Sequence, residues 1–338
     1  MIVDAQVSAR GGPTKYQQAV DALNDPSFSL EDGLALAMET AVPDLVLAYI
    51  HRGAPVNGVP KMLRRRETPL MWAVSAGATH LCVELLSKGA DPNGRGVPDS
   101  TFPLLLAAKL GRRDIVGLLL EHGAAIEATM GDYHCAKRNA LMAASEAGQV
   151  EIVRDLCAAG ANANAQTFRD GTTTLMLAAF RGSLSLCTIL LDAGARVNDG
   201  CTDAMGDKGR GPLAVAAGEG WVEECQLFLE RGAHLHAKRE RDAFAPLHEA
   251  VEGGHAPCVL LLCQAGADVN ALDIIGRSPL AIASEKKWTC SGWAICRILK
   301  QFGGRYLAPS TSDVGFHQML LSVAQSGGGG GDPNLQRR

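Results

Sequence analysis

Ten cysteines and nine histidines of this chain are candidate metal ligands or nucleophiles, and a cluster of glycines is a candidate phosphate-binding loop. Thiols and imidazoles bind metals or act as nucleophiles only where several of them converge. The dipeptide His248-Glu249 lacks the second His that a zinc-protease helix needs four residues later. No apolar strand precedes Gly206, Gly209 and Gly211, so they predict no phosphate-binding loop, and no G-x-S-x-G elbow occurs. We therefore predict no catalytic residue, no metal site and no cofactor.

Several cysteines share a periodic column with valine. The column consists of Val46, Cys82, Val116, Val153, Cys187, Cys225, Val259 and Cys296. Because only Cys and Val occupy it, we interpret these cysteines as small buried hydrophobic residues in a reducing compartment. Cys258 and Cys263 face different directions on one predicted helix, which makes them poor joint metal ligands. Cys135 and Cys201 fall in connecting segments, and they are the cysteines whose reactivity should be tested.

The stretch from Thr68 to Gly89 shows which secondary-structure elements carry the Cys and Val residues of this column. Thr68 can cap a helix that starts at Pro69 and ends at Gly77. A second helix follows and ends at Gly89. It carries its apolar residues on one side, namely Leu81, Cys82, Leu85 and Leu86. Two such short helices bury only one face each, so the hairpin needs copies of itself on both sides.

The chain contains eight such copies. With Thr68 as the first place of a unit, the third place is always Leu: Leu34, Leu70, Leu104, Leu141, Leu175, Leu213, Leu247 and Leu280. The sixth place is always Ala: Ala37, Ala73, Ala107, Ala144, Ala178, Ala216, Ala250 and Ala283. A closing Gly also recurs: Gly53, Gly89, Gly123, Gly160, Gly194, Gly232, Gly266 and Gly303. The Ala column predicts that neighbouring helices approach too closely for a larger side chain.

This unit resembles the ankyrin repeat, with its T-P-L-H-x-A-A-x-x-G start, its G-A-x-x-N end and a period near 33 residues. The resemblance extends from Asp32 to about Gly304. It implies an all-α fold, an ankyrin-repeat solenoid of stacked helical hairpins with short β-hairpin finger loops. Only His248 keeps the His of T-P-L-H, so the hydrogen bonds that this His makes in the family do not carry over to the other units.

We expect four regions along the chain. Residues 1–31 should form a mobile arm plus an N-terminal capping helix, which is marked by the helical stripe Tyr16, Ala19, Val20 and Leu23. Residues 32–304 should form the ankyrin repeat domain of about eight repeats. Residues 305–326 carry a second stripe and should form a C-terminal helix that either caps the solenoid or docks a partner; the stripe is Phe316, Met319, Leu320 and Val323. The Gly-rich residues 327–338 should be disordered.

Composition limits the classes of function. The chain is 47% hydrophobic with a net charge of -4, which argues against a general nucleic-acid binder. No apolar run approaches the length of a transmembrane helix, and residues 1–12 lack the apolar block of a signal peptide. We therefore expect no membrane insertion and a cytoplasmic monomer. Lys61 with Arg64 to Arg66 is a weak nuclear-import signal, which leaves an additional nuclear location open.

The resemblance implies that a partner protein binds along a concave surface of finger loops and first helices. We predict a scaffold or adaptor and no enzyme. The candidate contact residues are Arg64, Arg65, Arg66, Lys109, Tyr133, His134, Phe168, Phe180, Arg181 and Phe244. Phe180 beside Arg181 is the best anchor candidate, and the alternative is that Phe180 packs beneath a neighbouring finger. The Arg64 to Arg66 cluster suits an acidic partner segment.

Three alternatives accompany this interpretation. The chain could instead be a regulatory subunit, a substrate receptor or stoichiometric inhibitor, whose C-terminal helix docks a second partner, although no ligase-recruiting box is recognisable. Trp288 and Trp293 in the irregular last repeat either anchor a partner or pack over the end of the core. The resemblance also implies candidate asparaginyl hydroxylation at Asn57, Asn93, Asn164, Asn198 and Asn270. Their structural role would be to hold the closing turn through side-chain to backbone hydrogen bonds.

Overall fold

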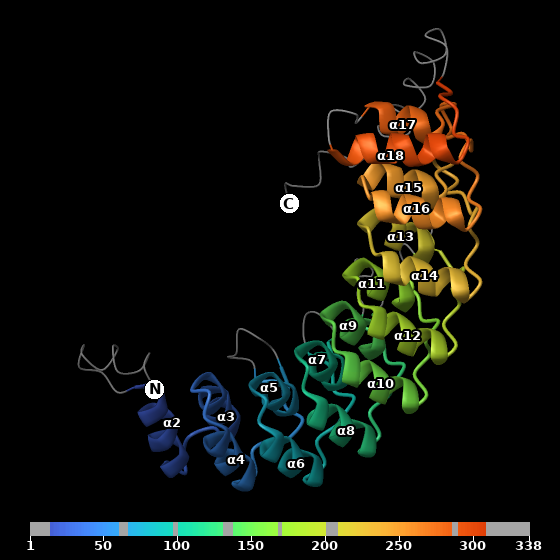
Figure 1. Cartoon of the computed structure of the whole chain (residues 1–338). Coiled ribbons are helices and arrows are strands. Elements are labelled where there is room, and N and C mark those ends of the chain that lie inside the picture. The colour runs from blue at the N-terminus through green and yellow to red at the C-terminus, as the bar shows by residue number, and fades with distance from the viewer. Residues whose placement is uncertain are drawn as a thin grey trace, which may run out of the picture. The chain divides into compact units, whose positions relative to one another are not determined.

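The computed structural model describes residues 14–60, 67–96, 101–130, 138–167, 171–200, 209–285 and 290–308. They form two compact units, unit 1 up to Arg196 and unit 2 from Val197. Each unit is a stack of helix pairs (Figure 1). In the described residues, β-structure is limited to the isolated bridges Met130–Arg138 and Gln166–Thr173. The predicted all-α fold is confirmed, and the described parts of the predicted finger hairpins show little regular strand pairing.

Unit 1 begins with α2 (Lys15–Asn24), which packs against α3 (Leu30–Glu39) and α4 (Pro43–His51). The Tyr49 hydroxyl donates to the backbone oxygen of Ala19 over 2.6 Å and so ties α2 to this first pair. The helix predicted over residues 16–23 is therefore present. The other pairs are α5 (Pro69–Ala76) with α6 (Thr79–Ser87), α7 (Pro103–Leu110) with α8 (Arg113–Glu121), α9 (Ala140–Ala147) with α10 (Val150–Ala158), and α11 (Thr174–Arg181) with α12 (Leu184–Asp192).

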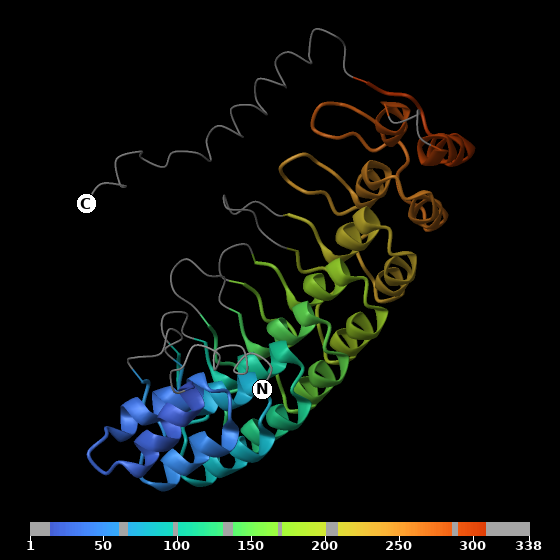
Figure 2. The ribbon, with the colours of Figure 1, turned by 90° about the vertical axis from the view of Figure 1, so that its left-hand side faces the viewer.

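Unit 2 repeats this arrangement. Its pairs are α13 (Pro212–Glu219) with α14 (Val222–Glu230), α15 (Pro246–Gly253) with α16 (Ala256–Gln264), and α17 (Pro279–Glu285) with α18 (Cys290–Gln301). Within each unit, the first helices of consecutive pairs from α5 onward contact one another, and so do the second helices of consecutive pairs. The segments that join one pair to the next are here called connectors. Their described parts lie on one side of the helix layers in each unit (Figure 2).

Local sequence explains where the first helices begin and end. The Thr68 hydroxyl accepts the Met71 N–H over 3.3 Å, and Asn139 and Thr173 cap their helices in the same way. Gly77 then takes a left-handed conformation with φ of 68° and ends α5. A residue with a Cβ is strained there, which is why glycine recurs at this point of the unit. The predicted cap and stop are both confirmed.

The five asparagines of the closing turns each bridge two turns. The Asn164 side chain donates to the Gly194 oxygen over 3.0 Å and accepts the Arg196 N–H over 2.8 Å. The same two bonds form at Asn57, Asn93, Asn198 and Asn270. The predicted side-chain to backbone bonds therefore exist, but they join each turn to the next one. Asn162 supplies a bond within the turn itself, because its side chain accepts the Asn164 N–H.

Three repeats have another residue at this place, namely Glu127, His236 and, in the last repeat, Leu307. Glu127 still accepts the Asn162 N–H over 2.7 Å and so keeps half of the bridge. His236 is exposed, and the structure shows no such bridge from its side chain. The series of bridges is therefore interrupted within unit 2.

Unit 2 also contains a buried carboxylate at an otherwise apolar place. The fifth places of the units are Leu36, Trp72, Leu106, Ala143, Leu177, Val215, Glu249 and Ile282. The Glu249 side chain is only 2% exposed and accepts from Arg210 over 2.9 and 2.5 Å. Arg239 approaches the same carboxylate to 3.2 Å. Because the two arginines belong to consecutive connectors, one buried charge holds both connectors in place.

Replacing Asn164 by Ala should lower the free energy of unfolding by roughly 1–2 kcal/mol, because two hydrogen bonds between repeats are lost. The measurement is the urea midpoint followed by far-UV circular dichroism. His236→Ala is the matched control, since its side chain occupies the same place without the bridge and should change the midpoint little. Equal effects of the two substitutions would mean that the bridges do not stabilise the stack.

Replacing Glu249 by Gln should cost on the order of 2–4 kcal/mol of unfolding free energy, because Arg210 and Arg239 lose their shared carboxylate. The partial exposure of both arginines keeps the cost below that of a fully buried pair. Glu219→Gln, an exposed change on α13, is the control and should have little effect on a thermal or urea transition. A transition for Glu249→Gln within experimental error of the wild type would contradict this role.

Candidate partner-binding surfaces

The first helices of unit 1 expose apolar side chains near their C-terminal ends. Phe180, on α11, is 44% exposed, so it does not lie buried beneath a finger, and Leu110 on α7 is similarly exposed. Trp72, Leu106 and Leu177, at the fifth places, are half-buried. We call these five residues the unit 1 helix face. Leu110 follows Leu106 by one turn of α7, and Phe180 follows Leu177 by one turn of α11. Exposed large apolar side chains on a helix surface are typical of a protein contact surface.

Polar residues beside this face have different roles. Lys109 is exposed at the end of α7. Arg181 is also exposed, but it donates to the backbone oxygen of Glu146 over 2.8 Å. Its guanidinium lies so close to Gly148 that a Cβ there would be 2.9 Å from Nη2. Arg181 therefore links two repeats of unit 1, and its removal would disturb packing as well as any partner contact.

The remaining predicted contact residues divide into two groups. Phe244 is half-buried, with its ring stacked on His248 at a centroid distance of 5.3 Å, and the Arg239 guanidinium carbon lies 5.4 Å from the ring centroid. It therefore has a structural role in its connector. The others lie outside the described residues, and their partner contacts stay predictions: Arg64, Arg65, Arg66, Tyr133, His134 and Phe168.

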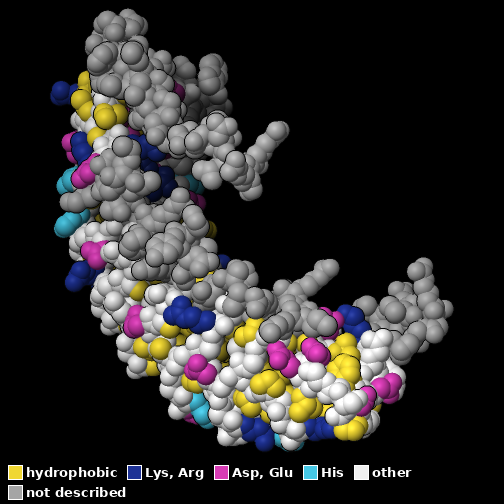
Figure 3. Space-filling model, turned by 180° about the vertical axis from the view of Figure 1, so that it is seen from behind, with side chains coloured by type: hydrophobic (Ala, Val, Ile, Leu, Met, Phe, Trp, Pro, Cys, Tyr) yellow, Lys and Arg dark blue, Asp and Glu magenta, His cyan; other side chains and the backbone are white. Residues whose placement is uncertain are grey.

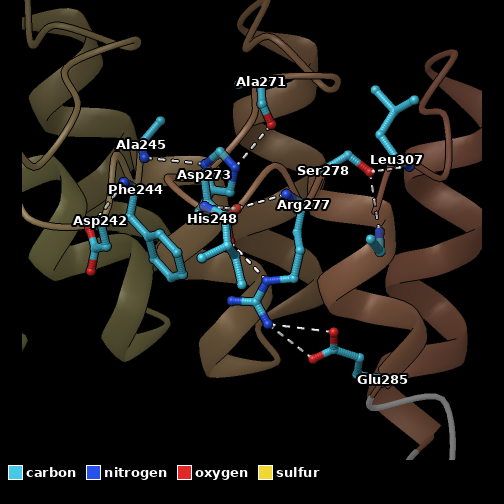
Figure 4. A network of polar contacts seen from close by, with 12 residues as sticks. Asp242, Phe244, Ala245, His248, Ala271, Asp273, Arg277, Ser278, Glu285 and Leu307 are labelled. Carbon is cyan, nitrogen blue, oxygen red and sulfur yellow. Dashed lines mark hydrogen bonds and ion pairs between the residues drawn. The ribbon is translucent and has the colours of Figure 1, made fainter. Parts of the chain in front are cut away.

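In unit 2 the connectors are tied to one another around His248 (Figure 4). Its Nδ1 accepts the Ala245 N–H over 3.2 Å, and its Nε2 donates to the Ala271 oxygen over 3.1 Å. Burial lowers the pKa of His248, which favours the neutral ring that has one donor and one acceptor. The Ile274 N–H also donates to the backbone oxygen of Asp242 over 2.9 Å. Connector 271–277 is thus fixed to connector 237–244.

Connector 271–277 is also braced from within. The Asp273 carboxylate accepts the backbone N–H groups of Ile275 and Arg277 and the Nε of Arg277, over 3.1, 2.7 and 2.9 Å. Arg277 reaches Glu285 at 3.2 Å as well. Ser278 joins this connector to the segment that follows α18, because its hydroxyl donates to the Arg305 oxygen over 2.6 Å. The backbone of this connector is therefore held at several points.

The space-filling view from the connector side shows Lys and Arg side chains exposed on this side of unit 2 (Figure 3). Arg210, Arg239 and Arg277 keep between 22% and 32% of their side chains exposed although each is in an ion pair. Our sequence reasoning missed this surface. The signals were Glu249 at an apolar place and the large apolar residues Leu272 and Ile274 in a connector.

Of the four cysteines in the column predicted to be buried, three are buried and Cys296 is half-buried. Cys82, Cys187 and Cys225 are fully buried, and burial raises the pKa of Cys82 to about 12, so it remains an unreactive thiol. Cys135 and Cys201 lie outside the described residues. In the part of the chain that is described, no group of three His, Cys, Asp or Glu side chains could hold a metal ion. None of the described helices has the length and apolar character needed to cross a membrane.

Trp293 at the start of α18 is 69% exposed, so the interpretation that it packs over the end of the core is wrong for this residue. Among the described residues, no helix pair follows α18 that could cover it. Trp288 lies outside the described residues. An exposed Trp on a helix remains compatible with a partner contact.

Known proteins that resemble this chain also contain repeats of this kind. An ankyrin-repeat family model, described as three copies, matches residues 34–130, 130–201 and 197–273. The chain is 33% identical over 218 residues to ankyrin repeat and SOCS box protein 16 of Homo sapiens, which covers 62% of this chain and 45% of that protein. It is 31% identical over 212 residues to an ankyrin repeat and KH domain-containing protein of Caenorhabditis briggsae, with 61% of this chain and 8% of that protein covered.

A third relative is the probable E3 ubiquitin-protein ligase XBOS33 of Oryza sativa, at 28% identity over 242 residues, with 62% of this chain and 45% of the relative covered. The chain thus spans less than half the length of these relatives. Ankyrin repeats form a non-catalytic fold that mediates protein–protein interaction. Since the family model matches most of the chain and the helix pairs recur as the sequence predicts, this chain belongs to the ankyrin-repeat family.

Proposed function

We propose that this chain is a scaffold or adaptor that binds a partner protein through the unit 1 helix face and acts by binding alone. The observation that carries the proposal is the exposure of Phe180 and Leu110 above the half-buried fifth-place residues of the same helices. These side chains sit on packed helices, so they lose little conformational freedom when a partner covers them.

The chemistry of the surface indicates the kind of partner segment. An apolar side chain of the partner would pack on Phe180 and the neighbouring fifth-place residues, and this contact would supply most of the binding free energy. Lys109 lies at the edge of this face and would attract an acidic group, which affects the rate and specificity of binding more than affinity. The predicted preference of Arg64 to Arg66 for an acidic segment belongs to the same proposal.

A second candidate function is that of a regulatory subunit, such as a substrate receptor. The observation that favours it is the similarity to one protein named for a SOCS box and another named as a probable ubiquitin ligase. In this version the repeats hold the substrate and residues 305–326 dock the second partner. The surface that contacts the first partner is the same in both candidates.

Phe180→Ala should weaken binding of the main partner about tenfold, because an exposed aromatic anchor of this kind contributes roughly 1–2 kcal/mol. The measurement is the Kd of a partner first recovered by affinity purification and then purified itself. The control is Val83→Ala, which removes an exposed apolar side chain from α6 in the layer of second helices. Arg181 is left intact because it supports packing. Unchanged affinity of the Phe180 variant would rule out this face as the binding site.

Deleting residues 310–338 distinguishes docking from capping. If this segment docks a second partner, its deletion should abolish that interaction and leave the melting temperature unchanged. If it caps the solenoid, the melting temperature should fall by several degrees, because apolar surface of the last repeat becomes exposed. Thermal unfolding and co-purification of partners, measured on the same two proteins, separate these outcomes.

A further inference from the structure

Connector 271–277 exposes two large apolar side chains in a segment that is polar in most repeats. Leu272 is 42% exposed and Ile274 is 46% exposed. The two residues are separated by Asp273, whose side chain is 1% exposed and turned inward to Arg277. The exposed part of these side chains contributes nothing to the fold of unit 2, whereas a partner that covers it removes apolar surface from water.

The backbone that carries these side chains is fixed in advance. Ile274 is held by its hydrogen bond to Asp242, and the Leu272 oxygen accepts the Lys238 Nζ over 3.3 Å. His248 holds the oxygen of Ala271 at the start of the connector. The neighbouring connector is equally constrained, since Arg239 and Asp242 pair across it. A partner therefore orders little chain on binding, which lowers the entropic cost.

The two connectors themselves carry a small excess of positive charge. Connectors 237–244 and 271–277 carry four basic residues and three acidic ones; the basic residues are Lys238, Arg239, Arg241 and Arg277, and the acidic residues are Glu240, Asp242 and Asp273. Asp242 is paired with Arg239, and Asp273 with Arg277. This leaves the exposed side chains of Lys238 and Arg241 against the single charge of Glu240. The surplus favours an acidic group beside the apolar contact.

We propose that connector 271–277 together with Lys238 and Arg241 is a docking site for an exposed protein segment in which an apolar side chain lies next to an Asp or Glu. The apolar side chain covers Leu272 and Ile274, and the carboxylate contacts Arg241 or Lys238. This proposal rests on the interaction function of the family, but it does not depend on the unit 1 helix face. The two surfaces belong to different units and can be tested independently.

The test uses the full chain and a phage-displayed library of random peptides. Clones that bind the wild type are then passed over a Leu272→Ser/Ile274→Ser variant, and those that bind this variant are discarded. The clones that remain need the two apolar residues. The surviving peptides should carry an apolar residue next to Asp or Glu. A synthetic copy of a selected peptide should bind the double variant about tenfold more weakly than the wild type. Its affinity should fall by a smaller factor with Arg241→Glu or when the salt concentration is raised.

Two controls make the result specific. Leu260→Ser removes an exposed apolar side chain from α16 of the same unit, and Phe180→Ala alters the unit 1 helix face; neither should change the affinity of these peptides. Circular dichroism verifies that each variant is folded, and Arg241→Glu carries the test if the double variant is not. The proposal is overturned if no clone distinguishes the wild type from the double variant, or if the distinguishing peptides carry Lys or Arg in place of acids. It also fails if neither Arg241→Glu nor Lys238→Glu lowers their affinity.

Discussion

The structure depends on one constraint, which is that a short helix pair can bury its apolar faces only against the next pair. Within each unit the first helices pack against one another, and the Ala residues of the Ala column are at most 1% exposed. A larger side chain there would force the helices apart, so the sixth place has almost no freedom. Residues that satisfy this constraint recur in every repeat and therefore carry no information about the partner.

Residue types differ most between repeats at the places where the packing of one helix pair on the next does not require a particular side chain. At the fifth place the helix surface is apolar and half-buried in Trp72, Leu106 and Leu177, but it becomes a buried carboxylate at Glu249. The two units accordingly present different chemistry. Unit 1 offers apolar helix surface, whereas unit 2 offers a row of connectors braced by ion pairs, with apolar residues on one of them.

The sequence was sufficient for what is local and periodic. Thr68, Gly77 and Gly89 act within one unit, so their roles could be predicted from the residues around them. Asn164 shows the limit of prediction from local sequence. Its side-chain to backbone hydrogen bonds were predicted, but the backbone groups that it bonds lie in the next repeat. The Arg210–Glu249–Arg239 cluster could not be predicted in detail, since its two arginines come from connectors of different length and meet a carboxylate on α15. The positions that stacking fixes were predictable, and the contacts between connectors were not.

The interrupted series of Asn bridges has a consequence for how unit 2 responds to force. Each bridge couples the sliding of one turn to the next, so a continuous series spreads shear along the stack. At His236 that coupling is absent, and the turns on either side are held together by helix packing and connector contacts alone. Shear applied along the closing turns therefore concentrates at this step. Unit 2 thus contains a defined point of mechanical compliance, set by one residue in an otherwise regular array.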